Sequence, residues 1–90
     1  MRINVELSEI QGFVAVAEKG SFRAAAESLF ISQPALSRRI EKLEAELGSR
    51  LVERTTRRVS LTESGRQFLT HAQAVLAEME KAVLGISERT

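Results

Sequence analysis

The sequence predicts a mainly α-helical fold, in which three short helices are followed by a two-stranded β-hairpin and a long fourth helix. Three observations support this prediction. Apolar residues recur at helical spacing in four segments, and residues typical of helix caps stand between these segments. One short stretch is instead rich in β-branched residues, which favour strands. With 43% hydrophobic and 28% charged residues, the 90-residue chain has the composition of one small folded domain.

Composition excludes several chemical functions. The chain has no Cys, so disulfides, thiol catalysis and Cys-based zinc sites are excluded. All twelve acidic residues are Glu and His71 is the only histidine, so one subunit cannot assemble a Ser-His-Asp triad or a multi-His metal site. No run approaches the ~20 apolar residues of a membrane span, and residues 1–4 do not resemble a secretory leader. We therefore expect a binding module and not an enzyme, with no metal, cofactor or membrane partner.

The first two helices are defined by their caps. Ser8 and Gln11 form a capping-box pattern that predicts a helix start near Glu9. Gly20 is expected to cap the end of this helix, and Ser21 the start of the next. Each helix has one apolar stripe, formed by Ile10, Phe13, Val14 and Ala17 in the first and by Phe22, Ala25, Ala26 and Leu29 in the second.

A third helix follows after a joint of three residues, 30–32. Ser32 is suited to cap its start, Pro34 is tolerated in its first turn, and Gly48 ends it. Its buried stripe is predicted to be Leu36, Ile40, Leu43 and Leu47. Two helices joined so closely must cross steeply, as in a helix-turn-helix. The spacing alone leaves open a plain helical hairpin from a bundle.

Residues 50–61 predict a β-hairpin, because short apolar runs at 51–52 and 59–61 flank a polar turn. Thr62 is expected to cap a fourth helix of about 25 residues, with Glu63 in its positive first turn. A heptad seam runs along this helix, formed by Phe68, Ala72, Val75, Met79, Ala82 and Ile86. Either the seam packs on the chain's own body or it meets a partner helix. We expect at least its distal half, residues 75–86, to contact a second subunit.

The net charge of +1 hides an uneven distribution. Residues 38–58 contain seven Lys and Arg against four Glu, and the segments on either side each have one net negative charge. Positive charge therefore gathers on the third helix and the hairpin, which favours DNA binding. Glu41 and Glu44 would repel phosphates, so we expect the later turns of the third helix to lie outside a DNA groove. The face opposite its apolar stripe is predicted to carry Pro34, Arg38, Glu41, Lys42 and Ala45.

The N-terminal part of the third helix holds the candidate base-contacting residues, which are Gln33, Pro34, Ala35, Ser37 and Arg38. Gln pairs with adenine, Arg with guanine or a phosphate, and small apolar side chains with thymine methyl groups. Arg57 and Arg58, at the hairpin tip, suit the minor groove or the DNA backbone. Arg39 lies at the flank of the helix, where either a phosphate or an intramolecular Glu is its expected partner.

Six blocks of sequence occur in a characteristic order: residues 13–22 (FVAVAEKGSF), 25–26 (AA), 32–38 (SQPALSR), 43–48 (LEAELG), 51–54 (LVER) and 61–65 (LTESG). Together they resemble the N-terminal DNA-binding domain of LysR-type transcriptional regulators, from about Leu7 to Gly65. The resemblance implies a winged helix-turn-helix domain over residues 1–62, with the helix-turn-helix at about 22–41 and the wing at about 50–61. It makes residues 63–88 a linker helix for dimerisation.

The resemblance also implies a partner and a set of contacts. The family binds double-stranded promoter DNA as a dimer on an interrupted palindrome, with the third helix in the major groove and the wing at the minor groove or backbone. The family's contacts fall on the same five positions of the third helix and on Arg57, while Ser32, Arg54 and Arg58 are further candidates. Residue 35 is Ala where some members have a second Pro, so a base preference read from a Pro-Pro pair does not transfer.

Further properties of the family concern parts outside this chain. Members carry a larger C-terminal domain that binds a small-molecule inducer and forms tetramers, and we expect that domain to be missing here. A bacterial, cytoplasmic location is expected. The alternative hypothesis is a helical protein-interaction or dimerisation module without specific DNA readout. It gives no reason for an outward Arg38 or for basic residues at the hairpin tip.

Overall fold

The structure is a computed structural model that describes residues 1–54 and 58–89. Its elements follow the order α1 (Leu7–Lys19), α2 (Phe22–Leu29), α3 (Gln33–Leu47), β1 (Val52–Arg54), β2 (Val59–Leu61) and α4 (Glu63–Arg89). The predicted fold, mainly α-helical with a two-stranded antiparallel hairpin, is confirmed.

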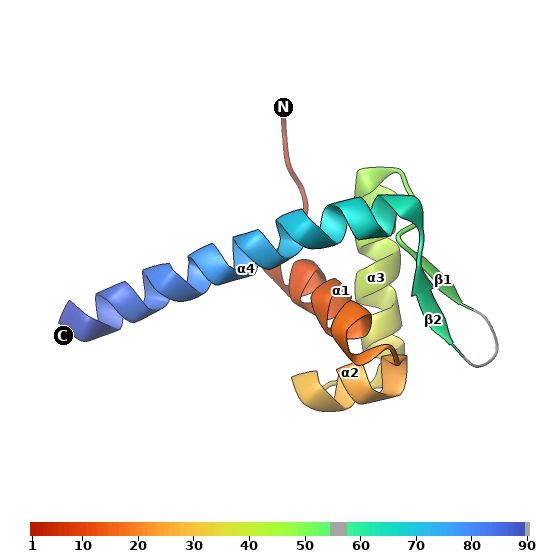
Figure 1. Cartoon of the computed structure of the whole chain (residues 1–90), viewed down its shortest axis with the longest axis horizontal. Helices are drawn as coiled ribbons and strands as arrows, with labels where there is room; N and C mark the ends of the chain where they lie inside the picture. The colour runs from red at the N-terminus through yellow and green to blue at the C-terminus, as the bar shows by residue number, and fades with distance from the viewer. Residues whose placement is uncertain (55–57, 90) are drawn as a thin grey trace.

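Helices α1, α2 and α3 form a body that α4 crosses on one side, and the hairpin extends from the end at which α4 begins (Figure 1). The 27 residues of α4 span about 40 Å, which is most of the 48 Å long axis of the molecule. Beyond Leu76 every residue up to Glu88 is exposed, because this part of α4 overhangs the body (Figure 1). The core consists of Phe13, Val14, Val16, Ala25, Ala26, Leu36, Ile40, Leu43, Leu51, Val52 and Ala72.

Local capping chemistry sets the end of α1, the starts of α2 and α3, and the end of α3. Gly20 and Gly48 end α1 and α3 in the left-handed conformation, each with φ of 68°. The hydroxyls of Ser21 and Ser32 each accept the backbone N–H three residues further on, at 3.1 and 3.2 Å. All four caps were predicted, because each depends only on residues within one helical turn.

The start of α1 differs from its prediction. The helix begins at Leu7 and not near Glu9, so the expected cap by Ser8 with Gln11 is wrong. Glu6 is the N-cap residue, and its backbone N–H donates to Oε1 of Glu9 at 3.2 Å. The capping pattern is therefore present two residues earlier, with a carboxylate where the prediction expected a hydroxyl.

Phe30, in the joint between α2 and α3, is the only non-glycine residue with positive φ in residues 1–54 and 58–89. Its φ is 58°, and its side chain is 95% exposed. We expect Phe30→Gly to raise the free energy of unfolding by about 1 kcal/mol, because it relieves left-handed strain without removing buried contacts. Urea unfolding measures this change. Phe30→Ala keeps the strain and serves as the control, so equal stabilisation by Ala and Gly would contradict the explanation.

The hairpin is an antiparallel pair in which Val52 lies opposite Leu61 and Arg54 opposite Val59. Strand β1 begins one residue later than the expected Leu51, which is itself 1% exposed and belongs to the core. Alternation along β1 places Val52 against the body and Glu53 in solvent. The base of the wing is therefore anchored by two buried side chains.

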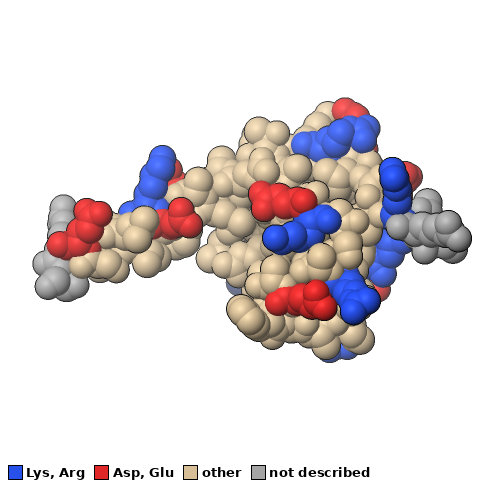
Figure 2. Space-filling model, turned by 60° about the horizontal axis from the view of Figure 1, so that its bottom comes forward, with Lys and Arg blue, Asp and Glu red and all other residues tan. Residues whose placement is uncertain are grey.

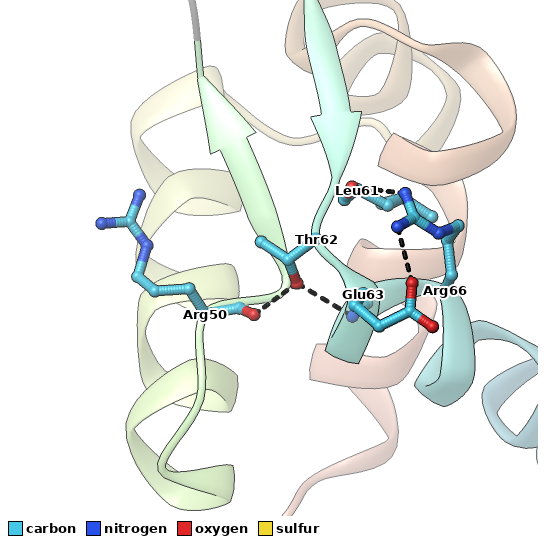
Figure 3. Close-up of polar contacts among 6 residues, drawn as sticks. Arg50, Leu61, Thr62, Glu63 and Arg66 are labelled. Atoms are coloured by element: carbon cyan, nitrogen blue, oxygen red, sulfur yellow. Dashed lines mark hydrogen bonds and ion pairs between the residues drawn. The ribbon is translucent and has the colours of Figure 1, made fainter.

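Thr62 joins the wing to α4 (Figure 3). Its hydroxyl donates to the carbonyl oxygen of Arg50 at 2.6 Å and accepts the N–H of Gly65 at 3.0 Å. Its own N–H donates to the carbonyl oxygen of Leu51 at 3.0 Å. Arg66, one turn into α4, donates to the carbonyl of Leu61 at 3.0 Å (Figure 3). The predicted cap of α4 is thus confirmed, and the same residue also closes the hairpin.

The proximal half of α4 packs on its own chain. The ring of Phe68 is half-buried, with its centroid 5.6 Å from that of Phe13 in α1. Ala72 is 0% exposed and belongs to the core. Its place in the predicted dimer seam is therefore wrong, because a side chain with no exposed surface offers nothing to a partner. The seam residues that remain exposed all lie further along α4. They fall within residues 75–86, the distal half that the sequence analysis expected to contact a second subunit.

Candidate nucleic-acid interface

The first two turns of α3 present the predicted base-contacting residues on one side. Ser32, Gln33, Pro34 and Arg38 are exposed, while Ala35 and Ser37 are half-buried. The opposite stripe is fixed in the core, with Leu36, Ile40 and Leu43 each 0% exposed. The outward direction of the N-terminal turns therefore follows from the burial of the apolar stripe.

Helix α3 packs closely against α1 where Gly12 of α1 faces Leu36 and Arg39 of α3. Gly12 of α1 is buried, and a Cβ added to it would lie 3.0 Å from Cδ1 of Leu36. The same Cβ would lie 3.8 Å from Cβ and Cδ of Arg39, so the aliphatic stem of this arginine runs beside α1. Within the described residues no Glu forms an ion pair with Arg39.

Lys42 is exposed, as the sequence predicted, but its ammonium group is paired with carboxylates of α1. Its Nζ lies 2.7 Å from Oε2 of Glu9, in the first turn of α1. It also lies 3.6 Å from Oε2 of Glu6, the N-cap residue of α1. The hydrogen bond that Lys42 donates to Glu9 raises the pKa of Lys42 above its ordinary value, so the lysine stays charged up to strongly alkaline pH. Glu9 is 2% exposed, and Lys42 neutralises its buried charge. This lysine is a structural residue that ties α3 to α1.

Glu44 has a role that the sequence did not indicate. Its Oε2 accepts the backbone N–H of Leu51 at 2.8 Å and that of Val52 at 3.1 Å. The carboxylate therefore points toward the wing, where hydrogen bonds to amide protons stabilise its charge. The pattern of residues in α3 gives no signal for this contact, because it depends on where the chain returns after Gly48.

Arg54 stands at the far end of β1, and its guanidinium carbon lies 4.3 Å from the ring centroid of Phe22. The family resemblance made Arg54 a candidate DNA contact, and the structure adds a cation–π contact with the first residue of α2. Arg50, Arg54 and Arg58 are all exposed, and Figure 2 shows Lys and Arg gathered at the wing end of the molecule. Over the middle of the same face they alternate with acidic residues (Figure 2). The predicted contact Arg57 lies outside the described residues.

Two structural features are absent from residues 1–54 and 58–89. No three His, Cys, Asp or Glu side chains of this part come together as metal ligands. No helix in it is both long enough and apolar enough to cross a bilayer.

The family model of the bacterial regulatory helix-turn-helix proteins of the lysR family matches residues 7–66. The chain belongs to this family. The match runs from the first residue of α1 into the first turn of α4, so it covers the whole helix-turn-helix and the wing.

Named LysR-family relatives are transcriptional regulators, in agreement with the prediction that the chain is not an enzyme. CrgA of Neisseria meningitidis is 48% identical over 82 residues, which are 91% of this chain and 27% of CrgA. TfdT of Cupriavidus pinatubonensis is 45% identical over 78 residues, which are 87% of this chain and 34% of TfdT. The chain thus spans about a quarter to a third of the length of these curated relatives.

Solved LysR-family structures share the fold over nearly the whole chain. The BenM DNA-binding domain in complex with catB site 1 DNA has a TM-score of 0.86 at 43% identity and covers 93% of each chain. The CbnR DNA-binding domain in complex with DNA has a TM-score of 0.84 at 39% identity and covers 93% of this chain and 94% of that one. OxyR of Corynebacterium glutamicum, in its oxidised form, has a TM-score of 0.91 at 36% identity over 96% of this chain and 28% of OxyR.

Proposed function

We propose that the chain binds double-stranded promoter DNA sequence-specifically, as the DNA-reading part of a bacterial, cytoplasmic transcription regulator. The N-terminal turns of α3 enter the major groove, and the wing contacts the minor groove or the DNA backbone. The observation that carries this proposal is the exposure of Gln33, Pro34 and Arg38 on a helix whose opposite stripe is fully buried. The DNA complexes of the BenM and CbnR domains support the same activity here.

Selection of bound sequences from a random duplex library tests the proposal. We expect one short half-site to be enriched, and to recur as an inverted repeat if two copies bind together. The same experiment returns the spacing between half-sites. A library from which no sequence is enriched would contradict specific readout and would favour the alternative of an interaction module.

Binding is expected to weaken steeply with salt, because Lys and Arg displace counterions from the phosphates. For about six phosphate contacts the affinity falls about 10³-fold between about 50 and about 200 mM salt. Fluorescence anisotropy with a labelled duplex measures this dependence. An affinity that is indifferent to ionic strength would show that the arginines of α3 and the wing do not face DNA.

Arg38→Ala is expected to weaken binding to the selected site by about 1–3 kcal/mol and to relax the preference at one base position. The reason is that Arg38 is exposed in the second turn of α3, where side chains reach base edges. Lys81→Ala removes the same charge from exposed α4, where Lys81 lies 3.7 Å from Glu78, and serves as the control. If Arg38→Ala weakened binding to all sequences equally, Arg38 would contact a phosphate and not a base.

We further propose that the distal half of α4 pairs with α4 of a second copy. Among the exposed apolar side chains of this half are Val75 at 44%, Met79 at 46%, Val83 at 56% and Ile86 at 69%. Their spacing places them along one side of the helix, and Ala82, from the predicted seam, is exposed beside them. A groove lined by Leu7, Gln11, Leu76, Met79, Glu80, Val83 and Leu84 continues this surface onto α1. A second copy would remove the apolar surface from water.

A further inference from the structure

The wing is attached to the helix-turn-helix at two separate points. At its base, the Glu44 carboxylate of α3 accepts the N–H groups of Leu51 and Val52 at 2.8 and 3.1 Å. At the end of β1, the Arg54 guanidinium lies 4.3 Å from the ring centroid of Phe22 in α2. These contacts add to the buried anchors Leu51 and Val52, and because they reach two different helices they also restrict the angle of the wing.

Strand geometry explains why the side chains of Val52 and Arg54 lie on the same face of β1. Side chains alternate along a strand, so residues two apart share a face. Val52 is 1% exposed and faces the body, which places Arg54 on the face that lies toward α2. Glu53, between them, points to solvent. The body-facing side of β1 therefore carries one buried anchor and one aromatic–cation contact.

Charged residues of both signs surround Glu44 at the base of the wing. A cleft between α3 and the wing is lined by Glu41, Glu44, Arg50 and Arg54. Two arginines of the wing thus share a cleft with two carboxylates of α3. A carboxylate near the DNA-facing elements weakens phosphate binding by repulsion unless it contributes in another way. Its hydrogen bonds to two backbone amides identify that contribution.

We propose that Glu44 is a positioning residue for DNA binding, which holds the wing at the angle at which wing and recognition helix reach one duplex together. Arg54, stacked on Phe22, is the second attachment. This inference rests on the proposed DNA-binding function. It assigns to Glu44 an effect opposite in sign to that of an ordinary acidic residue beside DNA.

Two variants of Glu44 separate the positioning role from the effect of charge. Glu44→Gln keeps an oxygen that accepts both N–H groups and removes the charge, whereas Glu44→Ala removes acceptor and charge together. In the 90-residue chain without DNA, amide exchange at Leu51 and Val52 is expected to be on the order of tenfold faster in Glu44→Ala than in Glu44→Gln. Equal exchange in the two variants would overturn the proposal.

Hydroxyl-radical footprinting on the selected duplex provides the DNA readout. We expect Glu44→Ala to lose the protection made by the wing while keeping the half-site preference of α3, and Glu44→Gln to retain both. If both variants bound more tightly and kept the wing footprint, Glu44 would act only as a repulsive charge and the inference would be wrong. A wild-type chain that protects no half-site would instead contradict the proposed function itself.

Phe22→Leu tests the second attachment with little risk to the core. Leucine fills much of the volume of phenylalanine and removes the aromatic face under Arg54. We expect partial loss of wing protection and unchanged protection by α3. An unaltered wing footprint in this variant, together with one in Glu44→Ala, would show that neither contact sets the angle of the wing.

Discussion

Gly65→Ala is expected to destabilise the domain by about 3 kcal/mol, at the upper end of the usual cost of overpacking a close contact. A Cβ at Gly65 would lie 2.1 Å from the carbonyl oxygen of Leu51 and 3.0 Å from its carbonyl carbon. These are backbone atoms, so no rotation of a side chain relieves the clash. The same carbonyl accepts the N–H of Thr62, so movement away from Gly65 weakens the bond that closes the hairpin.

Urea unfolding followed by circular dichroism measures this loss. Gly85→Ala is the matched control, because Gly85 lies in the same helix and has nothing within 4 Å of an added Cβ. It is expected to leave stability unchanged or to raise it by up to about 1 kcal/mol through helix propensity. A Gly65→Ala variant as stable as wild type would mean that α4 does not meet the wing at this distance.

Features that depend on a few neighbouring residues were predictable from the sequence. The caps at Ser21, Ser32 and Thr62 are examples, because each hydroxyl bonds a backbone N–H three residues away. The buried stripe of α3 was likewise predicted from its spacing, and three of its four members are 0% exposed. Leu47, the fourth, is 38% exposed, because it lies in the last turn of α3 at the edge of the body.

Contacts between distant segments were not predictable, and they decide the chemistry of the charged residues. A helical wheel places Lys42 on the outward face, yet its flexible stem reaches Glu9, 33 residues earlier in the chain. Glu44 was expected to be only a repulsive charge, whereas it binds the backbone of β1. Arg54 acquires an aromatic neighbour from α2. Periodicity assigns a side chain to a face, but it does not identify what another element brings to that face.

Met79→Glu is expected to abolish dimerisation and to weaken operator binding by about 10²-fold or more. Met79 is 46% exposed in the middle of the apolar side of α4, where pairing with a second copy would bury it. An unpaired carboxylate in such an interface costs far more than the hydrophobic contact it replaces. Operator affinity falls with the dimer, because two half-site contacts reinforce each other only while the two domains are linked.

Sedimentation equilibrium and anisotropy on the selected operator measure the two effects. Ala77→Glu is the control, because Ala77 is exposed on the opposite side of α4 and gains the same charge one turn before Lys81. The free energy of unfolding of the monomer is expected to change little in either variant, since both side chains are exposed in the monomer. Val75→Glu, one turn earlier on the same side of α4, is the second variant. If Met79→Glu and Val75→Glu both remained dimeric, pairing would not use this side of α4, and the exposed apolar side chains would require another partner. If only Met79→Glu remained dimeric, the interface would centre nearer Val75.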